Sequence, residues 1–398
     1  MKNSVLIIGI DGGASKVSAH SIDYNNDSFS LGKTNFTKEY KDLSSFDQNF
    51  NPVSLIAQLS QIKNNAIKLT QTEINQANAF YAAFVEVITK VVSALNPVKV
   101  IIGIGMPGIK SDDGRGIIAM VNGPRMPDFT SEIEKRLSDS GIVLALPIKK
   151  LGSDAYYCGI GEEHAINGAF KNVDNAYYLG GGTGVADALK LHGKLLALDD
   201  CKSWFAKTWE FKTENGISME NYCSANGIQK QYKYFAAKHV KLLVTNQVMI
   251  NEIVDRAANG EKPAIDTLKI VNKNIALLLF ERICTIYSGW QNSFAFIDSN
   301  RERPKINHKF VGTLLDRIIF GQRLGQTFSN QFSELIIKKP ILNHLSKLVK
   351  ESSVLEERAK SHYIKNGEFN NHITKHSLLR EAPALGAGIE AWNNYAKK

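Results

Sequence analysis

The residues near the start of the chain combine a carboxylate, two glycines, a hydroxyl and a lysine. Asp11, Gly12, Gly13, Ser15 and Lys16 directly follow a short apolar run. Glycines let backbone N–H groups face an anion without side chains in the way, while the carboxylate can position a magnesium-bound water and the lysine adds positive charge. The pattern predicts a phosphate-binding turn, although taken alone it is equally typical of an ordinary β-hairpin.

A second glycine-rich turn lies near the middle of the chain. It begins at Gly180 and continues through Gly181, Gly182, Thr183 and Gly184. It is not a P-loop, because no Gly-Lys-Ser/Thr follows at the required spacing, nor a dinucleotide fingerprint, because a strand rather than a helix follows. Two such hairpins, one in each domain, would hold the β- and γ-phosphates of a nucleotide from opposite sides of a cleft.

The elements around the first turn predict an α/β half-domain. Three consecutive strands joined by tight turns predict an antiparallel meander, and two helices then lead to a buried strand. This order is that of a ribonuclease-H-like half-domain. The predicted strands are 4–11, 17–24, 29–36 and 98–104, and the predicted helices are 53–69 and 73–95.

The pattern restarts after residue 123, so we predict two α/β domains. The first is a small domain, 1–123, and the second is a larger, helix-rich domain, 124–382, with a last helix, about 383–398, that packs back on the first. The second half should contain a helix at 130–138, strands near 142 and 148, a helix opening at Asp154, two strands within 176–191, helices across 218–288, a strand at 316–320 and a turn at 321–325.

Composition indicates an ordinary globular protein. Of 398 residues, 43% are hydrophobic and 22% charged, and the net charge of +9 is scattered among acids, so we expect no nucleic-acid partner. No uninterrupted apolar run is long enough to cross a bilayer, and the N-terminal run lacks a secretory cleavage site, so we expect a cytoplasmic protein without a membrane partner. The four cysteines are too widely spaced for a disulfide framework or a cysteine zinc site.

In the order of its motifs the chain resembles the sugar kinases of the ROK family (repressors, open reading frames, kinases), within the actin-like ATPase superfamily, over nearly its whole length. Residues 11–16 resemble the family's phosphate motif Asp-x-Gly-Gly-Thr-Lys, with Ser15 keeping the hydroxyl. Residues 103–108 resemble its Gly-x-Gly-x-Pro-Gly turn. The resemblance implies two ribonuclease-H-like domains flanking a cleft for nucleotide and sugar.

The resemblance also assigns roles to four further residues. Ser153-Asp154-Ala155 is similar to an Asn-Asp-Ala element whose aspartate is the catalytic base. Asn122 and Gly123 resemble a segment that contacts sugar hydroxyls, and Glu220 resembles a glutamate that binds the sugar. Without the glycine turns, Asp154 is better explained as a helix cap, because aspartate caps helices so often. An exposed helical glutamate is an equally good explanation of Glu220.

The segment between Gly193 and Ser218 departs from the family pattern. The Glu-x-Gly-His sugar segment and the cysteine-rich zinc knuckle are both absent there, so no structural zinc is expected. Glu210 is a candidate replacement for the lost glutamate, although its aromatic-rich surroundings are equally typical of packing. Gly321 and Gly325 resemble the adenosine segment and are expected beside the nucleotide, but Gln322 and Arg323 replace its usual paired glycines.

The expected function is the transfer of a phosphoryl group from Mg-ATP to a hydroxyl of a hexose or an N-acetylhexosamine. Asp154 would be the general base, and Asp11 would hold Mg²⁺ through water. The alternatives are a sugar-sensing transcription regulator, an iron–sulfur activator of a partner enzyme, and a catalytically silent protein that binds sugar or nucleotide. The regulator is disfavoured because only ten residues precede Asp11, and the activator because the cysteines are scattered. We expect a monomer or homodimer.

Overall fold

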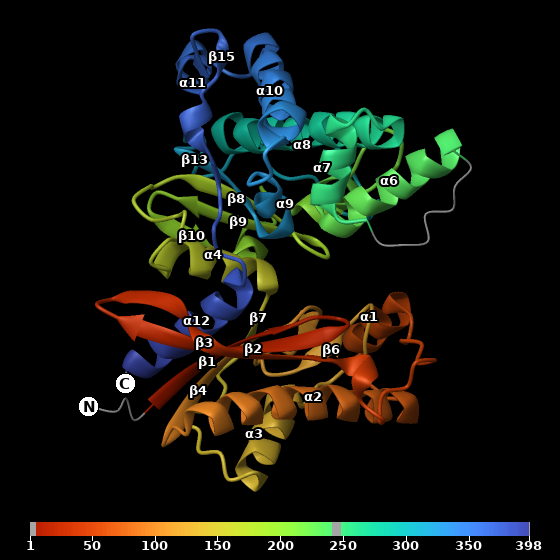
Figure 1. Ribbon diagram of the computed structural model, residues 1–398, viewed down its shortest axis with the longest axis vertical. Helices are drawn as coiled ribbons and strands as arrows, with labels where there is room; N and C mark the ends of the chain where they lie inside the picture. The colour runs from red at the N-terminus through yellow and green to blue at the C-terminus, as the bar shows by residue number, and fades with distance from the viewer. Residues whose placement is uncertain (1–4, 241–247, 398) are drawn as a thin grey trace. The chain divides into compact units, whose positions relative to one another are not determined.

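The computed structural model describes residues 5–240 and 248–397, and the chain divides into two compact units (Figure 1). The first unit comprises Met1–Ile166 and Glu381–Lys398, and the second comprises Asn167–Arg380. Each unit is built around one five-stranded mixed sheet. The predicted class, α/β with two ribonuclease-H-like domains, is therefore confirmed, and the second unit is the more helical one.

The sheet of the first unit has the strand order β3-β2-β1-β4-β7. The first three strands form the predicted antiparallel meander, and β4 and β7 run parallel to β1. The strands are β1 (Val5–Gly12), β2 (Lys16–Asn25), β3 (Ser28–Glu39), β4 (Lys99–Gly105) and β7 (Leu151–Gly152), with a small β5 (Ile109–Lys110) and β6 (Ile117–Ala119) pair beside them. The helices are α1 (Leu55–Lys63), α2 (Gln71–Leu95), α3 (Phe129–Asp139), α4 (Asp154–His164) and α12 (Ala382–Ala396).

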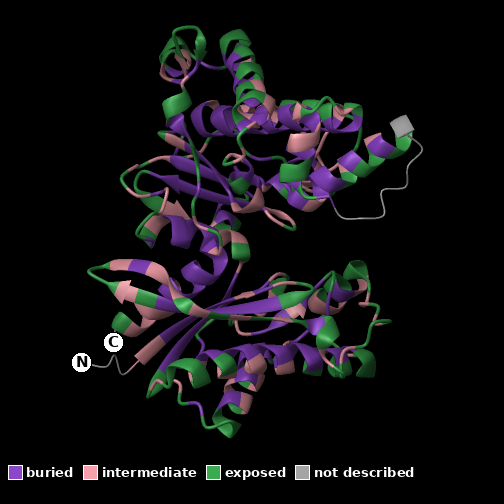
Figure 2. Ribbon diagram, viewed as in Figure 1, coloured by how far each residue is buried: buried purple, intermediate pink, exposed green. Residues whose placement is uncertain are grey.

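Helices cover both faces of this sheet. Successive side chains of a strand point to opposite faces, so Ile8 and Ile10 of β1 join the core under α2 and α3. On the other face lie α4 and α12, which pack against each other and, through α12, against β1 and β4 (Figure 1). The central strands are consequently buried on both sides (Figure 2).

Two glycines let α12 lie unusually close to the sheet. A Cβ atom on Gly9 would meet the carbonyl oxygen of Ala384, and one on Gly103 would meet that of Ala387.

We expect Gly103→Ala to lower the stability of the first unit by about 3 kcal/mol, because the backbone of α12 or of β4 must move to make room. Thermal denaturation would measure this loss. Gly13→Ala is the control, because the nearest atom lies 3.5 Å from its added Cβ and it should change stability little. Equal losses would contradict the steric explanation.

The sheet of the second unit has the order β10-β9-β8-β13-β16. It repeats the connectivity of the first sheet: an antiparallel meander, a helical crossover, and two further strands parallel to the first. The strands are β8 (Ala176–Gly181), β9 (Val185–Leu191), β10 (Lys194–Leu196), β13 (Arg317–Gly321) and β16 (Thr374–His376). Two smaller sheets are formed by β11 (Phe211–Lys212) with β12 (Ala295–Phe296), and by β14 (Ile364–Lys365) with β15 (Glu368–Phe369).

The crossover of the second unit is much larger than that of the first. Its centre is the long, mostly buried α8, against which α5, α6, α7 and α10 pack (Figure 1). The helices are α5 (Glu220–Cys223), α6 (Ala225–Val240), α7 (Ile250–Ala258), α8 (Lys262–Ser288), α9 (Gln322–Thr327), α10 (Lys339–Glu351) and α11 (Glu357–Tyr363). The stretch predicted as helical thus forms four helices, and part of that prediction, residues 241–247, lies outside the described residues.

The unit boundary differs from the one predicted after residue 123. Residues 124–166 belong to the first unit, because β7 pairs with β4 and α4 packs against α12. The restart in the sequence pattern is the last strand and helix of the first domain. The strands predicted near 142 and 148 are also wrong: that segment makes one isolated bridge, between Val100 and Leu144, and its strand begins at Leu151.

One helix among the described residues, α2, is long and apolar enough by composition to cross a bilayer. The sequence has no uninterrupted apolar run of that length, but one stretch of α2 carries few charged residues, so its mean hydropathy is high. Phe80, Phe84, Val87 and Val91 of this helix are buried in the core of the first unit. Core packing therefore accounts for its apolar composition.

Candidate active site

Asp11 lies at the edge of the first sheet where three parallel strands end. In the register of the sheet Asp11 of β1 is opposite Gly105 of β4, and Gly105 is opposite Gly152 of β7. Neighbouring strands are about 4.8 Å apart, so the backbones of Asp11 and Gly152 are separated by roughly 10 Å. Asp154 follows Gly152 by two residues, and the fold therefore brings the two predicted carboxylates to one sheet edge.

The first glycine turn is a tight β-hairpin between β1 and β2. The Gly13 N–H donates to the carbonyl of Lys16 at 2.9 Å, and Ser15 and Lys16 are exposed at the tip. Tyr40 anchors the turn, because its hydroxyl donates to the Gly13 carbonyl at 3.2 Å and its N–H to the Ser15 carbonyl at 2.9 Å. Gly12 is buried, and a Cβ there would meet Met106.

Asp154 is the first residue of α4, and it is not the residue that caps the helix. Ser153 is the N-cap, and its side chain accepts a hydrogen bond from the Tyr156 N–H at 3.2 Å. The Asp154 carboxylate is exposed and accepts a local hydrogen bond, from the Ala155 N–H at 2.9 Å. Since Ser153 satisfies the end of the helix, capping does not account for a carboxylate at this position.

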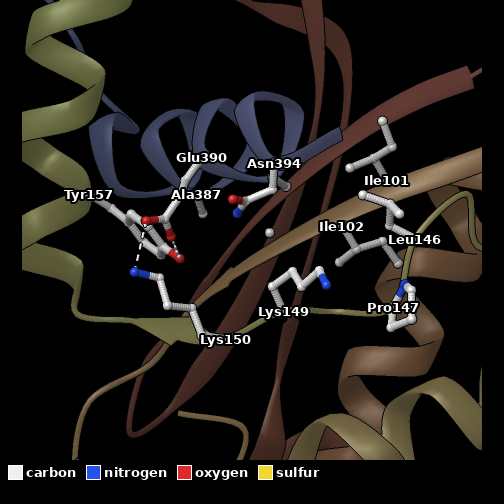
Figure 3. A pocket seen from close by; sticks show the side chains of 12 residues that line it. Ile101, Ile102, Leu146, Pro147, Lys149, Lys150, Tyr157, Ala387, Glu390 and Asn394 are labelled. Atoms are coloured by element: carbon white, nitrogen blue, oxygen red, sulfur yellow. Dashed lines mark hydrogen bonds and ion pairs between the residues drawn. The ribbon is translucent and has the colours of Figure 1, made fainter. Parts of the chain in front are cut away.

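A hydrogen bond holds the first turn of α4 against α12, and an ion pair holds the segment just before β7 against the same residue of α12. The Tyr157 hydroxyl donates to one oxygen of Glu390 on α12 at 2.8 Å, and the Lys150 ammonium lies 3.2 Å from the other oxygen (Figure 3). These residues line a small cavity of about 20 Å³ between β4, the segment before β7 and α12. The cavity contains none of the predicted site residues. Its side chains position α4, and with it Asp154.

The carboxylate of Asp11 has an unusual electrostatic environment. Burial raises its pKa to about 7, helped by the negative charges of Asp154 and Glu381, and the positive charge of Lys16 opposes them only in part. Close to neutral pH this carboxyl group therefore carries a proton for part of the time. A cation brought to the site would favour the ionised form.

We expect Asp11→Asn to stabilise the folded protein in a pH-dependent way. The folded pKa of about 7 exceeds the ordinary 3.8, so the folded state binds more protons than the unfolded state between these values, and wild-type stability falls as pH rises through this window. Asparagine does not titrate, so the variant does not lose stability in this way as pH rises. At pH 8 it should be more stable by about 1–3 kcal/mol, or roughly 2–10 °C in melting temperature, and at pH 4 nearly equal to wild type.

Melting curves at pH 4, 6 and 8 would measure this difference. Asp23→Asn, which removes an exposed carboxylate from neighbouring β2, is the matched control and should show no such trend. A difference in melting temperature between wild type and Asp11→Asn that stays constant with pH would contradict the raised pKa of Asp11.

The second glycine turn occupies the same place in the second sheet. Gly181 pairs with Val185, and the Gly182 N–H donates to the Gly184 carbonyl at 2.9 Å, leaving Thr183 exposed at the tip. Glu220 lies against this hairpin: one of its oxygens accepts from the Val185 N–H at 3.1 Å. The fold thus places the predicted sugar residue Glu220 beside the predicted phosphate turn of its own unit.

The segment predicted to lie beside the nucleotide, 321–325, forms only in part the turn that we expected. Gly321 ends β13 directly beside Gly180, at the edge that carries the second hairpin. The segment that follows is the helix α9 rather than a turn, and Gln322 adopts a left-handed backbone with φ of 54° to begin it. Gly325 is buried, and a Cβ there would lie 2.5 Å from the Phe320 carbonyl oxygen. Close packing therefore accounts for Gly325.

Glu210 is already engaged in an ion pair. One of its oxygens accepts from Arg301 at 2.8 Å and the other from the Lys207 N–H at 2.6 Å, with both charged side chains mostly buried. These contacts tie the aromatic-rich segment to residues that follow α8. They favour the packing explanation of Glu210 over a sugar-binding one.

Asn122 and Gly123 line a pocket of about 230 Å³ in the first unit. Asn122 is exposed, while Gly123 is buried, and a Cβ there would lie 2.8 Å from the end of the Met120 side chain. Two buried glutamines, Gln58 and Gln76, shape this pocket, and the sequence did not identify them as site residues. Their only signal was a polar residue on the buried face of a predicted amphipathic helix.

No known family model and no curated protein matches the sequence. Solved structures do match its fold. A ROK-family glucokinase from Streptomyces griseus, solved with glucose and AMPPNP, is 13% identical with a TM-score of 0.55, over 97% of this chain and 98% of that one. A ROK hexokinase from Thermus thermophilus is 13% identical with a TM-score of 0.53, over 99% and 100%.

A third match is a ROK-family transcriptional regulator, a homologue of the E. coli MLC protein. It is 12% identical with a TM-score of 0.55, over 99% of this chain and 79% of that one. Enzymes and a regulator therefore share this architecture, and the fold alone does not separate their functions. The resemblance found in the motifs extends to the whole structure: this chain has the fold of the ROK-family sugar kinases.

Proposed function

We propose that the protein transfers the γ-phosphoryl group of ATP to a hydroxyl of a hexose or an N-acetylhexosamine, with Asp154 as the general base. The observation that carries this proposal is the exposed Asp154 carboxylate, held at the sheet edge of the Asp11–Lys16 hairpin by a helix that Ser153 caps. A carboxylate that is not needed for capping is available to accept a proton.

In the proposed reaction the sugar oxygen forms a bond to the γ-phosphorus while the bond from that phosphorus to the β,γ-bridging oxygen breaks, and ADP leaves. Asp154 accepts the proton of the attacking hydroxyl. The exposed tips of the two glycine hairpins, around Ser15 and Thr183, would bind the phosphates, and Lys16 would add positive charge. Glu220 would reach the sugar with the carboxylate oxygen that does not bind Val185.

Asp11 suits a water-mediated contact to Mg²⁺. Its pKa is raised by burial and by two neighbouring carboxylates, so a divalent cation would compensate a charge that the protein leaves poorly balanced. Within residues 5–240 and 248–397 no group of three or more His, Cys, Asp or Glu side chains could hold a metal by itself. The ion would therefore take most of its ligands from phosphate and water. When bound, it neutralises charge on the phosphates.

A coupled assay of ADP release over a panel of sugars tests the proposal. We expect release to depend on one or a few of D-glucose, D-mannose, N-acetyl-D-glucosamine and N-acetyl-D-mannosamine, and to require Mg²⁺. ADP release at the same rate with and without sugar would contradict a sugar kinase. Complete absence of turnover, together with binding of ATP, would instead support the catalytically silent alternative, which shares this fold with the regulator.

A further inference from the structure

The pocket beside Asn122 is bounded on its other side by residues 46–52. Phe80, which is only 1% exposed, is its most deeply buried aromatic residue, and half-buried Phe46 and Phe50 add two more rings. Exposed Asp47 and Asn122 supply a carboxylate and an amide. The pocket thus combines aromatic faces with a few polar groups, which is the usual composition of a small-molecule site.

Two buried glutamines hold the two sides of the pocket in place. On one side, the Gln76 side chain accepts from the Asp47 N–H at 3.0 Å and donates to the Asp47 carbonyl at 3.4 Å. On the other, the Gln58 side chain accepts from the Met120 N–H at 2.8 Å and donates to its carbonyl at 3.0 Å. Each amide pairs with both polar groups of one backbone residue. The pocket is therefore preorganised and needs no ligand to form it.

The pocket borders the first glycine turn. Ala14, at the tip of that turn, is one of its lining residues. Phe80 stacks on Tyr40 with ring centroids 3.8 Å apart, and Tyr40 donates its hydroxyl hydrogen bond to Gly13. A molecule in the pocket would consequently lie next to the residues proposed to hold phosphate.

The lining also indicates the charge of the occupant. It contains no Lys or Arg side chain, and Asp47 contributes a negative charge, so an anionic sugar or a phosphate would be repelled. One oxygen of Asp47 accepts a hydrogen bond from the Asn49 N–H at 2.8 Å, and a polar molecule can bond to its second oxygen and to the Asn122 amide, whereas a purely apolar molecule would use neither group. A neutral sugar fits both conditions, because its C–H face can lie against the negative face of an aromatic ring while its hydroxyls bond to amide and carboxylate.

We propose that residues 46–52 form the specificity wall of the acceptor site, a proposal that rests on the sugar-kinase function above. Phe46 and Phe50 contact the C–H face of a neutral sugar, Asp47 accepts a hydrogen bond from one of its hydroxyls, and Asn122 binds it from the opposite side. This wall supplies contacts that Glu210, already paired with Arg301, does not.

Steady-state kinetics with the best sugar of the four-sugar panel test the wall. Val121→Trp should occlude the pocket from its rim, because Val121 lines it and is 59% exposed. We expect KM for the sugar to rise at least tenfold, while KM for ATP stays within about twofold. Phe50→Ala should raise the sugar KM about tenfold by removing a ring. The matched control is Val143→Trp, a 52% exposed valine of the same unit outside the pocket, which should change neither constant.

Unchanged sugar KM values in both Val121→Trp and Phe50→Ala would contradict the role of residues 46–52 in sugar binding while leaving the proposed kinase function intact. If no sugar of the panel drives ADP release, the proposed function fails, and the pocket is then tested by saturation-transfer NMR of the full chain with the same four sugars. Sugar signals that Val121→Trp abolishes and Val143→Trp keeps would support the pocket. Absence of signal with wild-type protein for all four sugars would overturn it.

Discussion

Asp154→Asn is expected to lower kcat for sugar phosphorylation by a factor of about 10²–10⁴, the usual contribution of a general base. Asparagine has nearly the same shape, and its side-chain oxygen can still accept the local hydrogen bond from the Ala155 N–H. Ser153, which caps the helix, is untouched. The variant should therefore fold normally and bind ATP with an unchanged dissociation constant, and the loss should appear in the chemical step alone.

The control for this experiment is Asp128→Asn. Asp128 is an exposed aspartate at the N-cap of α3 in the same unit, and its side chain makes no capping hydrogen bond. Both substitutions remove one negative charge from the start of a helix, so they match in charge and in their effect on the helix dipole. A loss of kcat in Asp154→Asn that is no larger than in Asp128→Asn would contradict the assignment of the base.

The sequence predicted the elements of the site well because chemistry and local structure coincide there. Glycine turns that connect apolar strands are strong local signals, and so is a Ser-Asp pair before a helix. The antiparallel meander and the helical crossover of the first unit followed from the succession of strands and helices. Asp11 at a strand end, the two hairpins between strands and Asp154 at the start of a helix could therefore be placed from the sequence alone. The sequence pattern nevertheless assigned Asp154 to the second domain, and it lies in the first unit.

Features that depend on distant contacts could not be predicted. The short strand β7 has only two residues, too few to show a period, so residues 124–166 looked like the start of a new domain. Whether Ser153 or Asp154 caps α4 depends on side-chain geometry that the pair of residue types leaves open. The partner of Glu210 is Arg301, far along the chain, and no local pattern connects them.

The buried charges of the second unit are the clearest example of a feature that could not be predicted from the sequence. Arg282 is fully buried, and it donates to the Ala206 carbonyl at 2.8 Å and to the hydroxyl of Thr208 at 3.0 Å. Its charge is compensated by Asp187 at 3.3 Å and Glu281 at 2.9 Å. Charged residues are rarely buried, so a sequence pattern assigns them to the surface. In this protein the buried charges anchor, to α8, the segment that follows β10.

Arg282→Met is expected to destabilise the second unit by about 3–5 kcal/mol, because it leaves buried Asp187 and Glu281 without a cation. Methionine fills much of the space, so loss of charge rather than loss of volume should dominate. Burial already raises the pKa of Glu281. Without the arginine the Glu281 carboxyl group should protonate more readily, and the stability difference between variant and wild type should shrink as pH falls from 8 to 5. Denaturant unfolding at several pH values measures it.

Two further variants separate this explanation from general damage to the core. Lys262→Met removes the exposed cation of an ion pair with half-buried Asp266 on the same helix, and it should cost at most about 0.5 kcal/mol. Asp187→Asn combined with Arg282→Met removes one of the stranded charges, so the double variant should be more stable than the sum of the two single effects predicts. Strictly additive losses would show that Asp187 and Arg282 do not depend on each other. The positive coupling expected here would show that the Asp187–Arg282 ion pair helps to anchor Ala206 and Thr208, in the segment between Gly193 and Ser218.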